Sequence, residues 1–181
     1  STISVASQRC RCHQELASIE TTVNITRRWI NAFVVDLNLC PFARREVVRN
    51  SMRFTVCEDS EPTDMLHALS EEITLLHNSQ NIETSFLILP AAMPDFLDFN
   101  DFLGTAQSLI ELLEWDGLYQ LVGFHPLYQF ADTEPDDAEN YTNRSPFPML
   151  HILRESSVGD AVATTPDAAL IPQRNNTTLA R

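Results

Sequence analysis

Thr84-Ser-Phe-Leu-Ile-Leu-Pro90 is the segment that most constrains the architecture, because it is a continuous apolar run of strand length. A strand covered on both faces has this composition, whereas a strand with one solvated face alternates apolar and polar residues. Runs with strand character lie on either side of it, at 52–57 and 118–124. The sequence therefore predicts a sheet with these three segments as its strands.

Two segments of helical periodicity alternate with these strands, at 63–78 and 95–115. The order strand, helix, strand, helix, strand is that of repeated βαβ crossovers. The predicted fold class is therefore α/β, a small βαβαβ sheet flanked by helices. An α+β sandwich of the ferredoxin-like type is the alternative, since the same elements form it if one strand has gone unrecognised.

The ends of the chain have a different character from its middle. A first helix is predicted from Thr21 or Thr22 to Leu37, ended by the Cys40-Pro41 pair. Residues 1–19 have no sustained apolar period and predict a flexible N-terminal arm, and residues 164–181 predict a flexible C-terminal tail. We expect a single globular domain over residues 20–163.

Composition and charge exclude several classes of protein. The 181 residues suit one domain that buries its own core, and the net charge is −13 with 12 basic residues, all of them Arg. Between Arg53 and Arg144 there is no basic residue, which argues against nucleic acid or an anionic membrane as partner. No apolar run is long enough to span a membrane, no secretory signal is recognisable, and the cysteines form no disulfide framework. The expected location is the cytoplasm.

A polar stretch near the C-terminal end carries many groups capable of chemistry: Asn140-Tyr-Thr-Asn-Arg-Ser-Pro-Phe-Pro-Met-Leu-His-Ile-Leu-Arg-Glu155. Its two prolines restrict the backbone, so Asn143 and Arg144 are expected on a stiff loop. Beyond the second proline the pattern predicts a helix that carries His151, Arg154 and Glu155. We expect a rigid polar loop that leads directly into a functional helix.

His125 follows the third predicted strand, at the carboxyl end where ligands collect in open α/β sheets. Our hypothesis is that His125, Asn143, Arg144, His151 and Arg154 converge on one concave site. The two histidines would act as general acid and base, and Arg154 would stabilise developing charge. Asn143, Arg144 and Tyr128 would bind a small anionic substrate.

A divalent metal is a further expectation for the same residues. His151 and Glu155 are four positions apart, which on a helix places both on one face, and His125 would complete a site for iron or zinc. The alternatives are a structural His–Glu hydrogen bond and, for the arginines, internal salt bridges with the abundant carboxylates.

Cys40 is the candidate for thiol chemistry, within Asn38-Leu-Cys-Pro-Phe-Ala43. If Pro41 begins a short helix, Cys40 is its N-cap, and the helix terminus together with Arg44 and Arg45 would lower the pKa of the thiol. A buried and inert thiol is the alternative.

Three blocks of this sequence, residues 38–43, the Phe124-His-Pro-x-Tyr-x-Phe130 motif and residues 140–155, together resemble a bacterial family known only as a domain of unknown function. The resemblance covers residues 20–163 and implies no activity, substrate or cofactor. From the residues alone we predict a small cytoplasmic enzyme that acts on a small anionic metabolite. The alternatives are a non-catalytic anion sensor and a thiol-dependent protein using Cys40. The open edges of a three-stranded sheet also allow a homodimer.

Overall fold

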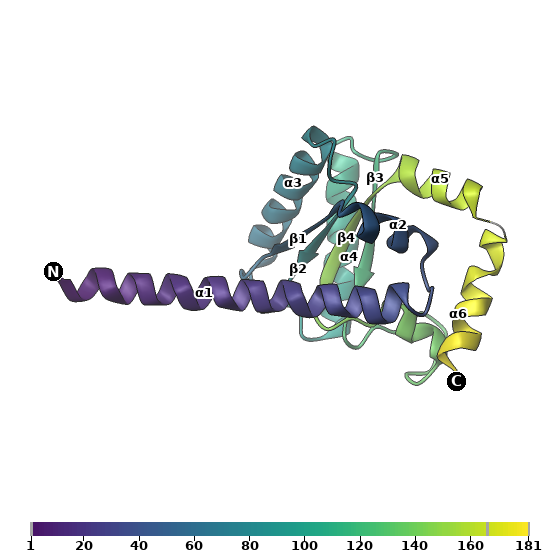
Figure 1. Ribbon diagram of the computed structural model, residues 1–181, viewed down its shortest axis with the longest axis horizontal. Coiled ribbons are helices and arrows are strands. Elements are labelled where there is room, and N and C mark those ends of the chain that lie inside the picture. Colours follow the sequence, from purple (N-terminus) through teal and green to yellow (C-terminus); the bar gives the residue numbers. More distant parts are fainter. Residues whose placement is uncertain (1, 166, 181) are drawn as a thin grey trace.

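The computed structural model describes residues 2–165 and 167–180, with side chains from Glu15 onward except that of Pro41. Figure 1 shows a sheet between two layers of helices, with one long helix that extends beyond the domain at its N-terminal end. The elements in chain order are α1 (Thr2–Trp29), the π-helix η1 (Ile30–Val35), α2 (Pro41–Arg49), β1 (Met52–Val56), α3 (Pro62–Asn78), β2 (Thr84–Ile88), α4 (Phe96–Leu112), β3 (Tyr119–Phe124), the 3-10 helix η2 (Ala138–Asn143), β4 (Met149–Arg154), α5 (Glu155–Thr164), the 3-10 turn η3 (Ala168–Leu170) and α6 (Ile171–Leu179).

The four strands form one sheet in the order β1-β2-β4-β3. β1 pairs in parallel with β2, while β4 is antiparallel to both β2 and β3. β1, β2 and β3 therefore run in the same direction, as expected for a βαβαβ unit, and the α/β fold class is confirmed. The shared direction of these strands rules out the antiparallel ferredoxin-like alternative.

β4 is the strand that sequence reasoning missed. The helix expected directly after Pro148 is wrong, because Met149–Arg154 is a strand and the helix α5 begins only at Glu155. β4 lies between two other strands and is covered on both faces, so its apolar residues do not alternate with exposed polar ones. A six-residue segment with four apolar residues, such as Met149–Arg154, is compatible with either a strand or a helix turn.

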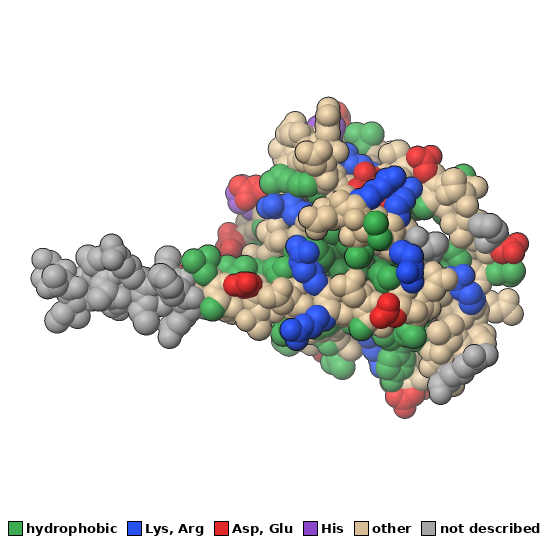
Figure 2. Space-filling model, viewed as in Figure 1, with side chains coloured by type: hydrophobic (Ala, Val, Ile, Leu, Met, Phe, Trp, Pro, Cys, Tyr) green, Lys and Arg blue, Asp and Glu red, His purple; other side chains and the backbone are tan. Residues whose placement is uncertain are grey.

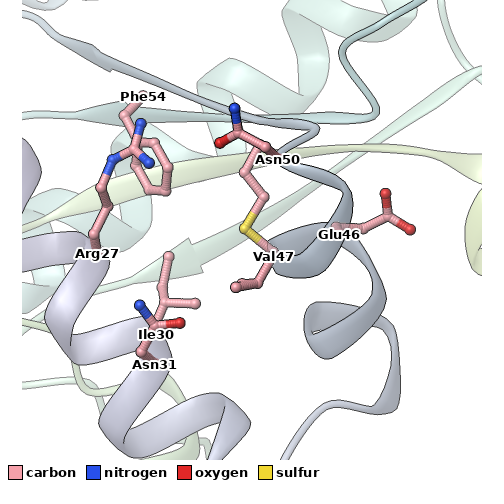
Figure 3. A pocket seen from close by; sticks show the side chains of 8 residues that line it. Arg27, Ile30, Asn31, Glu46, Val47, Asn50 and Phe54 are labelled. Atoms are coloured by element: carbon pink, nitrogen blue, oxygen red, sulfur yellow. The ribbon is translucent and has the colours of Figure 1, made fainter.

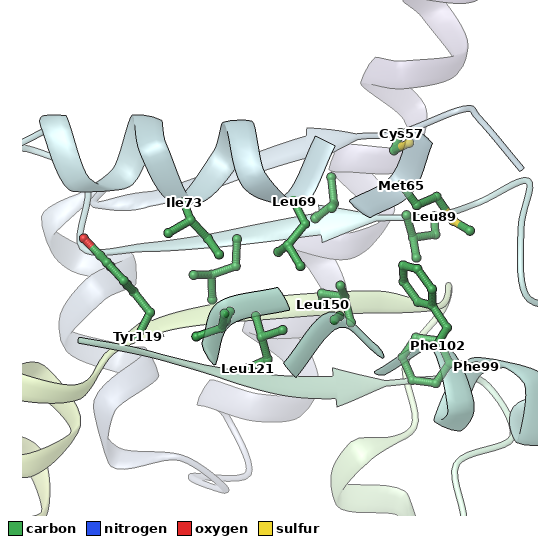
Figure 4. Packing of buried hydrophobic residues seen from close by; sticks show 14 of the residues in the cluster. Cys57, Met65, Leu69, Ile73, Leu89, Phe99, Phe102, Tyr119, Leu121 and Leu150 are labelled. Carbon is green, nitrogen blue, oxygen red and sulfur yellow. The ribbon is translucent and has the colours of Figure 1, made fainter. Parts of the chain in front are cut away.

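Helices cover both faces of the sheet. On one face, which we call the α3–α4 face, Leu69 and Ile73 of α3 and Phe99 of α4 pack on strand residues such as Leu87 and Leu150 (Figure 4). On the opposite face, η1 and α2 pack on Phe86, Ile88 and Met149, and α5 and α6 lie nearby. We call this second side the cavity face.

The ends of the chain differ from expectation. α1 begins at Thr2, so the predicted start at Thr21 or Thr22 is wrong; the helix ends at Trp29, and η1 follows. Its N-terminal part extends away from the domain (Figure 1), which explains the lack of an apolar period there. Flexibility of residues 2–19 stays a prediction, and Ser1 lies outside the described residues.

The C-terminal segment is also more structured than its sequence suggests. Residues 171–179 form α6, and the Asn175 side chain donates a hydrogen bond to the carbonyl of Leu39, 2.9 Å away. Arg174 likewise donates to the carbonyl of Asn38. The segment is thus tied to the α1–α2 connection, and Pro166 and Arg181 lie outside the described residues. In the described part of the chain, no helix is both long and apolar enough to cross a membrane.

Candidate functional site

His125 lies at the end of β3 and points to the α3–α4 face, where its ring packs between Phe96 and Phe99 of α4. Its Nδ1 accepts a hydrogen bond from the backbone N–H of Leu127, and its Nε2 is 2.9 Å from the carbonyl oxygen of Met93. Since a carbonyl only accepts, Nε2 carries the proton. Both nitrogens are therefore used within the fold, and the side chain is 1% exposed. His125 joins the β2–α4 loop to the turn after β3.

His151 lies on the opposite face of the sheet, at the centre of β4. Its ring stacks on Phe86 with 3.9 Å between ring centroids, and Phe124 flanks it on the other side. Because His125 and His151 are on different faces, the single site predicted for them is wrong. The metal site predicted from His125, His151 and Glu155 fails for the same reason, and the described residues include no group of three or more His, Cys, Asp or Glu that could hold a metal ion.

The hydrogen bonds around His151 determine which nitrogen carries its proton. Thr84 Oγ1 lies 2.6 Å from the carbonyl oxygen of Ile152 and 2.7 Å from His151 Nε2. The single hydroxyl proton must go to the carbonyl, so Nε2–H donates to Thr84. Burial lowers the pKa of His151 to about 3, which keeps the ring neutral. Nδ1 is then a bare acceptor, and no described residue hydrogen-bonds to it.

Both predicted site arginines bind backbone carbonyls instead of carboxylates. Arg154 donates to the carbonyls of Leu76, Ser79 and Ile82 and so closes the C-terminal end of α3. Arg144 donates to the carbonyls of Tyr128 and Pro135 and stacks on Tyr141 at 4.4 Å. Cations at a helix C-terminus and in a loop of carbonyls are stabilising, so both guanidinium groups have a structural role in the fold.

The remaining predicted residues also have local partners. Asn143 Nδ2 donates to the carbonyl of Gly123, while its Oδ1 accepts from Thr142. The Tyr128 ring packs on Phe96 and Phe130, and burial raises the pKa of its hydroxyl. Glu155 is exposed in the first turn of α5. Of these three side chains, only that of Asn143 borders a sizeable cavity.

Cys40 is the N-cap of α2 with Pro41 at the first helical position, as predicted. Its thiol is half-buried. Burial raises the pKa of Cys40, and the backbone N–H groups of Ala43 and Phe42 only partly oppose this change. The lowered pKa expected from the helix terminus and Arg44 and Arg45 is therefore wrong, and the thiol is protonated at neutral pH.

Cys40 and His151 border the same cavity, on the cavity face between the sheet and α2, α5 and α6. This apolar chamber has a volume of about 290 Å³, and none of its described lining residues is charged. Its walls are Leu39, Cys40, Phe42, Gln120, Val122, Phe124, His151, Leu153, Val158, Ala161, Val162, Thr165 and Ile171.

A second cavity adjoins the first and shares Leu39, Cys40, Phe124 and Ile171 with it. We call it the polar chamber after its five polar residues, although most of its wall surface is apolar, and its volume is about 480 Å³. Its other walls are Val34, Phe130, Glu139, Thr142, Asn143, Pro172, Asn175 and Asn176. Three of the residues predicted from sequence, Cys40, Asn143 and His151, thus lie around two adjacent chambers.

Sequence reasoning missed the other walls of these chambers. Gln120 had a recognisable signal, because β3 alternates Tyr119, Leu121 and Gly123 on the α3–α4 face with Gln120 and Phe124 on the other. A polar residue on a covered strand face indicates a cavity or a partner. The residues of α6 had no such signal, since their segment was expected to be unstructured.

A smaller hollow lies between α1, α2 and β1, where Arg27 stacks on Phe54 at 4.6 Å (Figure 3). Its volume of about 60 Å³ is too small for an organic ligand. Arg27, Arg28, Arg44 and Arg49 are exposed on these helices, and Figure 2 shows basic side chains gathered on this side of the molecule. The chambers are therefore the better candidate for a small-molecule site.

A comparison with protein-family models matches residues 21–181 to a family described as a protein of unknown function, DUF1415. The match covers nearly the whole chain, so the protein belongs to this family, and the resemblance to a domain of unknown function is confirmed. The match also includes α6, which places the C-terminal segment within the family domain. Comparisons with curated proteins and with solved structures found no significant match.

Proposed function

We propose that the protein binds a small organic molecule whose largely apolar body lies in the apolar chamber. The observation that carries this proposal is a neutral histidine on the floor of a cavity whose other walls are mainly aliphatic and aromatic. Ligand pockets typically have this character, with a few polar groups that fix orientation in a mainly apolar space. The volume of about 290 Å³ suits a ligand of one or two rings.

The polar groups of the chamber indicate how a ligand would be oriented. His151 Nδ1 is an acceptor without a partner among the described residues, because Nε2–H already donates to Thr84. A ligand with one N–H or O–H donor would satisfy it, and the Gln120 amide offers both a donor and an acceptor. Within this chamber, an apolar group with a single hydrogen-bond donor is therefore the best fit.

An anionic metabolite, as predicted from the sequence, is not supported by this chamber. No basic side chain is among its described walls, and an anion without a cationic partner would lose its hydration at a high cost. Arg144, which was expected to bind the anion, and Arg154, which was expected to stabilise developing charge, donate hydrogen bonds to backbone carbonyls instead.

Thiol-dependent catalysis at Cys40 is the second candidate, because the thiol borders both chambers. Its raised pKa supports a protonated and slowly reacting group, which favours binding over nucleophilic attack. Alkylation by N-ethylmaleimide, mapped by mass spectrometry, decides this point. The thiol candidate requires Cys40 to react much faster than Cys57, which is buried at the end of β1 on the α3–α4 face. Equal slow reaction of both would eliminate it.

Fluorescence titration with 1-naphthol tests the proposed binding, since this probe is neutral at pH 7, has two aromatic rings and carries one O–H donor. We expect saturable binding of one probe per chain. Ala161→Phe places a ring in the chamber from α5 and should abolish binding. Ala163→Phe on the same helix is the control, because Ala163 is exposed and does not border the chamber.

Two results would overturn the proposal. One is a wild-type protein that does not bind the probe at all. The other is equal binding by the Ala161→Phe and Ala163→Phe variants, which would place the probe elsewhere on the surface.

A further inference from the structure

The polar chamber contains a buried acceptor that lacks a partner. Asn175 is 7% exposed, and its Nδ2 donates to the carbonyl of Leu39 at 2.9 Å. This hydrogen bond fixes the orientation of the amide, because a flipped amide would place two acceptor oxygens against each other. The Oδ1 atom is then the one buried side-chain oxygen or nitrogen among the described residues without a hydrogen-bond partner. A buried acceptor in this state is destabilising until a donor reaches it.

The described walls of the polar chamber carry negative charge and no positive charge. Glu139 contributes a half-buried carboxylate, and the described walls include no Lys or Arg. No described residue forms an ion pair or a side-chain hydrogen bond with this carboxylate. The chamber is therefore suited to a group that is positively charged and carries several donors.

The two chambers lie next to each other, because four residues line both of them. Leu39, Cys40, Phe124 and Ile171 border the apolar chamber on one side and the polar chamber on the other. An elongated molecule with its body beside His151 would place its end near Asn175 and Glu139.

We infer that the ligand is an apolar amine, with its hydrocarbon or aromatic body in the apolar chamber and its ammonium head in the polar chamber. The inference rests on the proposed function and names its ligand class. An ammonium group has three donors, so it satisfies Asn175 Oδ1 while it neutralises Glu139. An alcohol of the same length supplies one donor and no charge, and a carboxylate supplies neither a donor nor the right sign.

The inference predicts that an amine binds more tightly than an alcohol, and an alcohol more tightly than a carboxylate. Calorimetric titration with hexylamine, hexanol and hexanoate measures these affinities directly, without the fluorescent probe. We expect hexylamine to bind roughly fivefold more tightly than hexanol, as a partly exposed ion pair and one hydrogen bond contribute modestly. Hexanoate should bind more weakly than hexanol.

The Glu139→Gln variant tests whether hexylamine binds at this site or is only attracted by the negative net charge of the protein. It should bring the dissociation constant of hexylamine close to that of hexanol, since the charge is removed and the shape kept. Glu134→Gln, an exposed carboxylate of the same loop that borders neither chamber, should leave the preference unchanged.

The outcomes distinguish the inference from the proposed function. Equal affinities for hexylamine and hexanol, or equal effects of the two variants, would overturn the inference while binding of the neutral probe still supports the chamber as a site. Loss of probe binding in wild-type protein would overturn the proposed function. An amine preference that depends on Glu139 would then place the ammonium site in the polar chamber alone.

Discussion

The two faces of the sheet are covered by helices of different lengths, and the free space follows this difference. On the α3–α4 face, two helices of 17 residues each lie along the strands, and residues such as Leu69, Phe99 and Leu150 are fully buried (Figure 4). On the cavity face, the C-terminal end of α1 and η1 pack near β1, while the helices around the chambers, α2, α5 and α6, have only 9, 10 and 9 residues. Short helices leave part of a sheet face uncovered, and here both chambers lie in that part.

Polar groups follow the same division. On the α3–α4 face, the buried Glu72 carboxylate accepts hydrogen bonds from Arg53, Thr55 and Ser85. On the cavity face, His151 Nδ1 and Asn175 Oδ1 have no described partner. One face thus satisfies its polar groups internally, while the other leaves acceptors for a ligand. We therefore expect stability to depend mainly on the first face, and the proposed ligand binding to depend on the second.

Truncation of one leucine on each face should show the largest difference between the faces in the free energy of unfolding. Leu150 and Leu153 both lie on β4, but Leu150 packs in the α3–α4 core whereas Leu153 borders the apolar chamber. Leu150→Ala should lower the free energy of unfolding by about 3–5 kcal/mol, and Leu153→Ala by about 1–2 kcal/mol, because the second side chain has fewer packing partners to lose. Urea denaturation measures both. Equal losses would break the distinction between the faces.

Arg154 should prove structural, because it belongs to the α3–α4 face. Arg154→Met removes hydrogen bonds to three carbonyls at the end of α3, which should cost about 2–3 kcal/mol of unfolding free energy. The exposed Arg28 on α1 is the control, and Arg28→Met should change stability by less than about 0.5 kcal/mol. If the Arg154→Met protein were fully stable but did not bind the probe, Arg154 would belong to the functional site and not to the structural core.

Glu72 makes the contribution of the α3–α4 face to folding stability depend on pH. Burial acts to raise the pKa of Glu72, but hydrogen bonds from Arg53, Ser85 and Thr55 outweigh it and hold the pKa below its ordinary value of 4.5. Its contribution is therefore present above pH 4.5 and is lost as the pH falls through the folded-state value.

At pH 7, Glu72→Gln should lower the free energy of unfolding by about 1–2 kcal/mol, a moderate loss because Arg53 is partly exposed. The difference from wild type should shrink in acid, whereas Glu71→Gln, at an exposed neighbouring position, should have little effect at any pH. Denaturation curves at pH 7 and pH 3 measure this. A constant difference between these pH values would contradict the assignment.

His151 gives the cavity face its own, smaller pH dependence. Because the folded protein holds the pKa near 3, the unfolded chain alone takes up the proton as the pH falls below 6.5. Between pH 7 and 5.5 this should lower the free energy of unfolding by about 1 kcal/mol. His151→Phe should remove that slope, and His67→Ala, at an exposed position on α3, should retain it. An NMR titration in which the His151 ring gains its proton near pH 6.5 would show that the chamber is open to bulk water.

Much of the α3–α4 face could be predicted from sequence, and little of the cavity face could. Helices at 63–78 and 95–115 were recognisable because their apolar residues recur with the helical period, which depends on near neighbours alone. The role of Cys40 as an N-cap was equally local, since Pro41 follows it. By contrast, β4 was mistaken for a helix because His151 and Arg154 looked like a polar helix face. Their partners, Thr84, Leu76 and Ser79, lie far away in the sequence.

Sequence periodicity was enough to predict an α/β protein with strands at 52–57, 84–90 and 118–124, because strand and helix periods are properties of contiguous residues. The order of the strands and the position of the site depended on tertiary structure. β4 inserts between β2 and β3, which places His125 and His151 on opposite faces of the sheet. α6 then closes the two chambers from the other end of the chain. Contacts between distant segments decide which side chains share a cavity, and such contacts leave no local pattern in the sequence.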